Sequence, residues 1–200
     1  MTEILKNLYD IGHRGNLRGK AKAGFVRPTI KEFFTSCNYE EVPQSIFTGE
    51  YTTNKCVGGV VSASGGNLPL KAFDGSTYIT YSQWNSAAWH FISLPAEDPW
   101  IQYQFTESQR IEKLVMYNCN LTNGVEGVAS FILYGSNDGL NFTEITSGTR
   151  QNANVAGAET FIFENSHSYL IYRFKAHFYG TVGGSGASLY ELQMMEGIYA

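Results

Sequence analysis

The sequence predicts an all-β protein, built as a β-sandwich or a β-barrel of about eight strands behind a mostly irregular N-terminal arm. Aromatic residues make up 14% of the 200 residues and charged residues 16%, which favours buried strands, and 21 glycines can supply turns between them. From residue 57 onward, short apolar or alternating segments follow one another with loops between them. None of these segments has a convincing helical period.

Residues 1–56 are interpreted as a docking arm and linker, and residues 57–200 as the folded domain. Within residues 1–34, Lys and Arg outnumber Asp and Glu by seven to three, and glycines interrupt the apolar positions. Such a segment buries too little apolar surface to fold alone, so we expect it to dock on an acidic partner. We do not expect it to bind nucleic acid, because its basic residues form no helical face and are not interleaved with aromatic residues.

The strands of the domain follow from local patterns. A short first strand is expected at residues 60–64. Farther along, Ile101, Tyr103 and Phe105 alternate with polar or amphipathic residues, which predicts a strand with one buried face. The other strands are expected at 111–119, 131–145 (a hairpin), 159–164, 169–178 and 188–195.

Several classes of protein are disfavoured by the sequence. Cys37, Cys56 and Cys119 are odd in number and lack metal or redox spacing, so we expect free thiols. The N-terminus has no apolar run of signal-peptide length, and no 18 apolar residues occur in a row, so we expect a soluble protein without membrane contact. The four histidines are scattered and no nucleophile motif occurs, so we expect no enzyme.

Six segments of the domain occur in a recognisable order. They read AFDG at 72–75, PWIQYQF at 99–105, IEKLVM at 111–116, FILYGSNDGLNF at 131–142, YLIYRF at 169–174 and SLYELQM at 188–194. Together they resemble the discoidin, or coagulation-factor type C, domains and the family 32 carbohydrate-binding modules. The resemblance covers roughly residues 57–196 and implies a galactose-binding-like jelly-roll β-sandwich.

The resemblance implies a structural role for the hairpin. In such domains the serine and asparagine side chains hold the turn, the glycine takes a positive φ, and the aromatic residue folds back onto the core. The matching residues are Ser136, Asn137, Gly139 and Phe142. Asp138 is then expected to shape the turn and to take no part in chemistry.

The resemblance also implies a cation in the loop at residues 64–81. The matching ligand positions are Asp74, Thr80 and Glu191, with Thr77 as an alternative to Thr80. Oxygen-only ligation suits calcium, so a structural Ca2+ ion is the expected cofactor. The alternative is that Asp74 caps a turn and Glu191 pairs with Arg173 or with a backbone amide.

Sugar-binding relatives use aromatic and polar side chains in loops at one end of the sandwich. The candidates in this chain are Trp84, Asn85, Trp89, His90, Phe178 and Tyr179. Aromatic side chains in glycine-rich loops are unfavourable unless they pack or bind something. In these relatives a tryptophan near this point belongs to the core, so the resemblance implies that one of Trp84 and Trp89 is a core residue and that the other is the candidate glycan platform.

These expectations combine into a function. The chain combines a jelly roll, a basic arm and no visible export signal. Together these features predict a non-catalytic structural protein of a bacteriophage, located in the virion as part of a tail or head fibre. Residues 1–50 would dock on other virion proteins, and the domain, as a homo-oligomer or in many copies, would bind a host glycan. The alternative is a purely architectural protein whose jelly roll packs against proteins without binding sugar. An accessory module of a secreted glycosidase is a third class, but it predicts a signal peptide or a linker rich in Pro, Thr and Ser.

Overall fold

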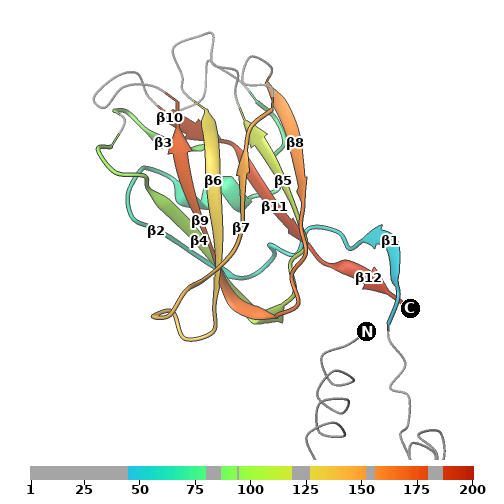
Figure 1. Cartoon of the computed structure of the whole chain (residues 1–200). Coiled ribbons are helices and arrows are strands. Elements are labelled where there is room, and N and C mark those ends of the chain that lie inside the picture. Colours follow the sequence, from blue (N-terminus) through green and yellow to red (C-terminus); the bar gives the residue numbers. More distant parts are fainter. Residues whose placement is uncertain (1–44, 80–86, 94, 119–126, 152–155, 180–186) are drawn as a thin grey trace, which may run out of the picture. The chain divides into compact units, whose positions relative to one another are not determined.

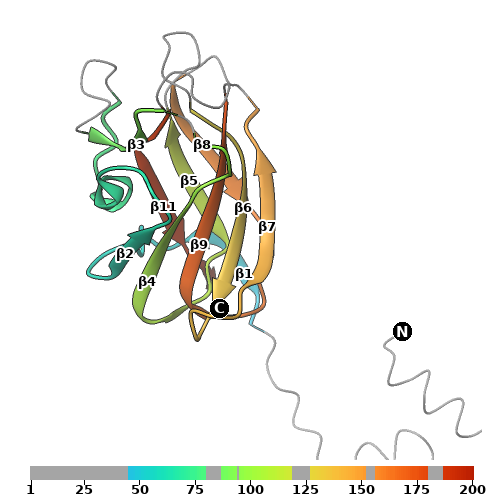
Figure 2. The ribbon, with the colours of Figure 1, turned by 90° about the vertical axis from the view of Figure 1, so that its left-hand side faces the viewer.

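The computed structural model describes residues 45–79, 87–93, 95–118, 127–151, 156–179 and 187–200. Two antiparallel sheets form the sandwich that is visible in Figure 1 and, turned by 90°, in Figure 2. The elements are β1 (Phe47–Tyr51), β2 (Val60–Ala63), the 3-10 helix η1 (Pro69–Phe73), β3 (Trp89–Phe91), β4 (Trp100–Gln109), β5 (Lys113–Asn118), β6 (Val128–Ser136), β7 (Thr143–Thr149), β8 (Gly157–Ile162), β9 (Tyr169–Phe178), β10 (Ala187–Leu189), β11 (Glu191–Met195) and β12 (Gly197–Tyr199).

The strands are ordered β2-β4-β9-β6-β7 in the larger sheet and β11-β5-β8 in the smaller one. Two further antiparallel pairs stand at opposite ends of the sandwich, β3 with β10 at one end and β1 with β12 at the other (Figure 1). The jelly-roll prediction is therefore confirmed. One end of the sandwich carries the β3–β10 pair and the other carries the β1–β12 pair.

The alternating pattern of the sequence decides which side of each long strand is buried. Ile101, Tyr103 and Phe105 on β4 are buried, and so are Tyr172 and Phe174 on the neighbouring β9. Successive side chains of a strand point to opposite faces, so these five side chains line the interior between the sheets. The expected inward face of this strand is thus confirmed.

The short elements were not predicted. The expected strand at 188–195 is divided at Tyr190 into β10 and β11, and the expected long loop contains η1. The strands β1, β3 and β12 have only three to five residues each, which is too short to show a period in the sequence. No helix in the described ranges is long and apolar enough to cross a membrane.

The turn between β6 and β7 is held by its own side chains. Ser136 Oγ accepts a bond from Gly139 N (3.0 Å), and Gly139 has a φ of 72°, which glycine adopts without strain. Asp138 Oδ1 accepts bonds from the backbone N–H groups of Leu140 and Asn141, both at 2.8 Å. The expected roles of the serine and the glycine are confirmed, and Asp138 caps the turn.

The aromatic residue after the turn does not reach the core, contrary to the expectation. The Phe142 ring lies over the Arg173 guanidinium at 3.7 Å, and the Trp100 ring lies 4.1 Å from the same group. Arg173 is on the outer face of β9, because its neighbours Tyr172 and Phe174 point inward. Phe142 therefore covers the outside of the larger sheet, where a cation holds it.

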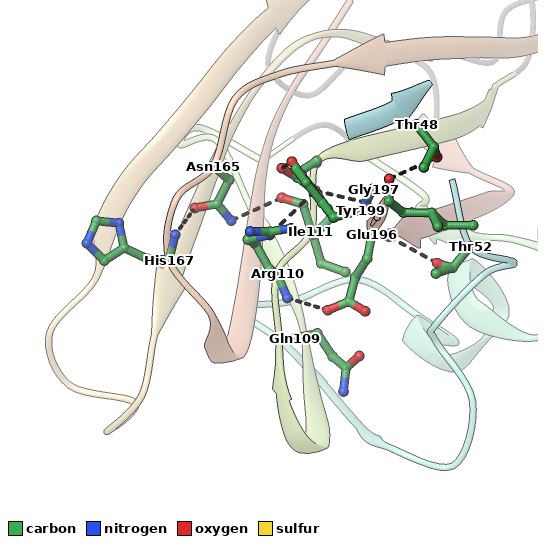
Figure 3. Close-up of polar contacts among 12 residues, drawn as sticks. Thr48, Thr52, Gln109, Arg110, Ile111, Asn165, His167, Glu196, Gly197 and Tyr199 are labelled. Atoms are coloured by element: carbon green, nitrogen blue, oxygen red, sulfur yellow. Dashed lines mark hydrogen bonds and ion pairs between the residues drawn. The ribbon is translucent and has the colours of Figure 1, made fainter. Parts of the chain in front are cut away.

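The residues that precede β2 are joined to the C-terminal end of the described chain. Thr52 Oγ1 accepts a bond from Glu196 N (3.0 Å; Figure 3), and Asn54 Oδ1 accepts one from Met194 N (3.0 Å). Cys56 is buried in the core, and burial raises the pKa of its thiol. Residues 52–56 thus contribute both hydrogen bonds and apolar contacts to the sandwich.

These contacts predict a difference between two truncated chains. A chain that starts at Ser45 should melt cooperatively, and a chain that starts at Val57 should lose about 1–3 kcal/mol of stability. The loss should lower the melting temperature by roughly 2–10 °C. Thermal melting followed by circular dichroism measures the difference, and equal midpoints would show that residues 45–56 contribute nothing.

The turn predicts a pH-dependent effect. The backbone N–H of Asn141, its side-chain amide and the N–H of Leu140 hold the pKa of the Asp138 carboxyl well below its ordinary value of 3.8. The stabilisation is therefore complete above that ordinary value and is lost as the pH falls below it. Asp138→Asn should lower the melting temperature at pH 7, and the deficit should shrink in acid. Glu144→Gln, an exposed carboxylate on β7, is the control.

Candidate functional site

A buried carboxylate lies where β11 begins. Glu191 has no exposed surface and is paired with Tyr117 on β5. Its Oε2 accepts a hydrogen bond from Gly75 N (3.2 Å), whereas its Oε1 has no hydrogen-bond partner among the described residues. An unpaired buried carboxylate oxygen is unfavourable, so this position needs a compensating group.

Asp74 is brought near Glu191 by the short helix η1. Asp74 is the C-cap residue of η1. Its Oδ1 accepts a hydrogen bond from Ser76 N, and its Oδ2 forms an ion pair with Lys71 Nζ, both at 2.9 Å. Two of the three predicted metal ligands thus come together. The third, Thr80, lies outside the described residues.

The surroundings of Glu191 change its acidity. Burial, and next the charge of Asp74, raise the pKa of the Glu191 carboxyl to about 7. Arg173, the cation considered as its partner, instead donates from Nε (2.9 Å) and Nη2 (2.8 Å) to Gln102 Oε1. Arg173 and a backbone amide were the two alternative partners of Glu191, and the structure shows the backbone amide, that of Gly75.

Within the described ranges, no group of three His, Cys, Asp or Glu side chains could hold a metal ion. Among the described residues, Asp74 and Glu191 are therefore the acidic side chains considered as ligands in this region. Further oxygen ligands would have to come from hydroxyls or backbone carbonyls.

The predicted ligand residues that the structure describes, Trp89, His90, Phe178 and Tyr179, lie on or beside β3 and the end of β9. Trp89 has no exposed surface, and its Nε1 donates to Gly65 O (2.9 Å). Its ring packs edge-on against Phe178 at a centroid distance of 5.8 Å. Trp89 and Phe178 are therefore core residues beneath the loops, and neither presents a face to a ligand. Trp89 is the core tryptophan that the sequence left unassigned.

His90 is held by its neighbours in the same way. Its backbone pairs with Asn67, and its ring Nδ1 lies 3.1 Å from the carbonyl oxygen of Ala88, to which it donates in the corresponding tautomer. The side chain is buried in the described structure, and ligand binding by His90 stays a prediction.

Tyr179 is the exposed member of the described set. It follows Phe178 at the end of β9, its backbone N donates to Gly127 O (3.0 Å), and its side chain is 41% exposed. Trp84 and Asn85 lie outside the described residues. Tyr179 therefore stays available for stacking on a ligand at this end of the sandwich.

The structure also reveals a site that sequence reasoning missed. A cavity of about 540 Å³ lies between the β1–β12 pair and residues 162–166. Glu112, which lines it, is buried and accepts hydrogen bonds from the Tyr199 hydroxyl and from Gly197 N. A glutamate between Ile111 and Leu114 on a strand signals a buried charge, and that signal was present in the sequence.

Solved structures share this fold at low sequence identity. A family 32 carbohydrate-binding module of NanJ from C. perfringens, solved in complex with galactose, is 18% identical, with a TM-score of 0.55 over 74% of this chain and 100% of that one. Chitosan-binding module 1 of a chitosanase/glucanase from Paenibacillus sp. IK-5 is 19% identical, with a TM-score of 0.53 over 72% and 98%.

A further Clostridium perfringens module of the same kind, in complex with GalNAc-β-1,3-galactose, is 17% identical and has a TM-score of 0.52 over 72% of this chain and 99% of that one. No curated protein matches the chain. The sequence profile of the F5/8 type C domain matches residues 52–174, more than half of the chain. The chain therefore belongs to the F5/8 type C domain family.

Proposed function

We propose that this chain is a non-catalytic glycan-binding protein that binds sugar through the loops at the β3–β10 end of its sandwich. The observation that carries the proposal is the F5/8 type C domain on a fold shared with a module solved with galactose. At this end of the sandwich, Trp89 and Phe178 are buried and pack edge to face as an apolar floor. A rigid floor supports loop side chains that bind, and Tyr179, Trp84 and Asn85 are the proposed ligand residues.

The proposal extends to a place in a larger assembly. The expected docking segment is residues 1–50, but β1 (Phe47–Tyr51) pairs with β12 in the domain, so the residues before Ser45 would anchor the chain to other proteins of a virion, a bacteriophage tail or head fibre, and the domain would face the host. The support is the excess of Lys and Arg in residues 1–34 beside an acidic remainder. Mass spectrometry of purified particles tests this placement, and particles that lack the chain would exclude it.

A structural calcium ion is part of the proposal. The unpaired Oε1 of Glu191 and the adjacent Asp74 carboxylate fit a hard cation, because two carboxylates close together need positive charge. Glu191 and Asp74 would hold the ion, with Thr80 as a further ligand. The ion would order the loop that carries η1 and would take no part in a reaction.

One observation favours a second function, protein packing without sugar. Four exposed aliphatic side chains lie on and beside the edge strand β2, namely Val57, Val60, Leu68 and Leu70. Leu68 adopts a left-handed φ of 52°, a conformation that is strained for leucine. Exposed apolar side chains beside an open sheet edge are typical of protein interfaces. An architectural protein would use this surface.

Binding of a multivalent form tests the glycan proposal. The protein displayed on beads should bind galactose- or N-acetylhexosamine-terminated sugars on an array, since display in many copies raises avidity by about two to four orders of magnitude. Tyr179→Ala should weaken this binding at least tenfold without lowering the melting temperature. Leu140→Ala, an exposed apolar residue in the β6–β7 turn at the other end, is the control. Folded beads that bind no sugar would favour the architectural function.

Melting with and without calcium tests the cation. The pKa of Glu191 is raised in the folded chain, so in chelator the wild-type protein should lose stability as the pH rises from about 4.5 through about 7. Calcium at about 100 times its Kd should restore about 2.7 kcal/mol. Glu191→Gln should remove both the pH slope and the calcium response. Equal midpoints in calcium and in chelator at pH 8 would exclude the ion.

A further inference from the structure

The cavity at the β1–β12 end has the composition of a ligand site. It is lined by three aromatic residues of the terminal strands, Phe47, Tyr51 and Tyr199, and by Arg110. The Phe47 ring lies 5.3 Å from the Tyr51 ring and 5.6 Å from the Tyr199 ring, and Phe47 is 42% exposed. A volume of about 540 Å³ is in the range of small-molecule pockets.

Buried polar contacts hold this wall in place. Glu112 accepts bonds from the Tyr199 hydroxyl and from Gly197 N (2.8 Å). A Cβ atom on Gly197 would lie 2.6 Å from the Glu112 carboxylate, so a larger residue here would displace that side chain. The backbone N of Arg110 donates to Glu196 (2.6 Å; Figure 3). The site is therefore preorganised and does not have to form on binding.

Arg110 supplies donors at the edge of the aromatic wall. Its guanidinium lies over the Tyr199 ring at 4.0 Å, its Nε lies 3.6 Å from Glu112 Oε2, and a third of its side chain is exposed. On the other side of the cavity, Asn165 donates to Ile111 O (3.0 Å; Figure 3), and the exposed Glu164 offers a carboxylate. The lining thus combines aromatic faces with both donors and acceptors.

The charges of the lining select the class of ligand. Glu112 offsets the charge of Arg110 within the lining, and the exposed Glu164 disfavours an anion. A neutral ligand with an apolar face and several hydroxyls satisfies the aromatic rings and the polar groups together. We propose that the cavity between β1, β12 and residues 162–166 is a second carbohydrate site for a neutral pyranose. That the ligand is a sugar rests on the proposed function, whereas the location of the site rests on the cavity itself.

NMR spectra of the full chain with isotope-labelled Phe and Tyr rings test the site directly. D-galactose and N-acetyl-D-glucosamine should shift the ring signals of Phe47, Tyr51 and Tyr199 in the wild-type protein, with a Kd of about 1 mM. Acetate and tetramethylammonium are the charged comparison probes. Shifts with a charged probe alone, or no shift with any probe, would overturn the proposal without the need for a variant.

Variants at the two ends separate this site from the loops. Phe47→Ala and Arg110→Gln should each weaken the shifts at Tyr51 and Tyr199 at least tenfold, and Tyr179→Ala should leave them unchanged. Loss of the shifts in Tyr179→Ala alone would overturn the second site and leave the proposed function standing. Absence of sugar binding both in these spectra and on the array would overturn both proposals.

Discussion

Packing of aromatic rings between the two sheets is the interaction on which the rest of the structure depends. Phe131 on β6 meets Phe161 on β8 at 4.8 Å, edge to face, which joins the larger sheet to the smaller one. Phe131 also stacks on Phe174 at 4.9 Å. Such pairs add about 0.5–1.5 kcal/mol each beyond the burial of their area. Because this interior is rigid, the short strand pairs at both ends of the sandwich can hold side chains in defined positions.

Three buried polar side chains differ in how completely their hydrogen-bonding groups have partners. The Tyr172 hydroxyl donates to Gln109 O (2.7 Å) and accepts from Ile111 N (3.1 Å), and burial raises its pKa to about 12. Glu112 is likewise surrounded by donors. Glu191 keeps one oxygen without a partner among the described residues, although it is buried just as completely. That contrast within one molecule is the physical reason why the proposed cation is placed at Glu191 and not at Glu112.

The jelly roll separates the two proposed ligand sites in space. The β3–β10 pair, which carries Trp89, and the β1–β12 pair, which carries Tyr199, lie at opposite ends of the sandwich (Figure 1), so one occupied site does not block the other. A module with two weak sites could bridge sugar chains, and many copies in one assembly would add avidity. Both proposed sites rely on aromatic side chains, and in the β1–β12 site the buried Glu112 holds Tyr199 and Arg110 in place.

The sequence by itself determined the long strands and the β6–β7 turn, because two-residue alternation and turn residues act over a few neighbouring positions. It also showed that one tryptophan would be buried, but only the tertiary structure decided that this is Trp89, because the choice depends on contacts with Phe178 and Gly65. The same holds for Phe142, which a distant arginine draws to the outer face. The cavity beside Tyr199 was beyond sequence reasoning, since its walls come from strands that are too short to show a period and that meet only when the ends of the domain pair.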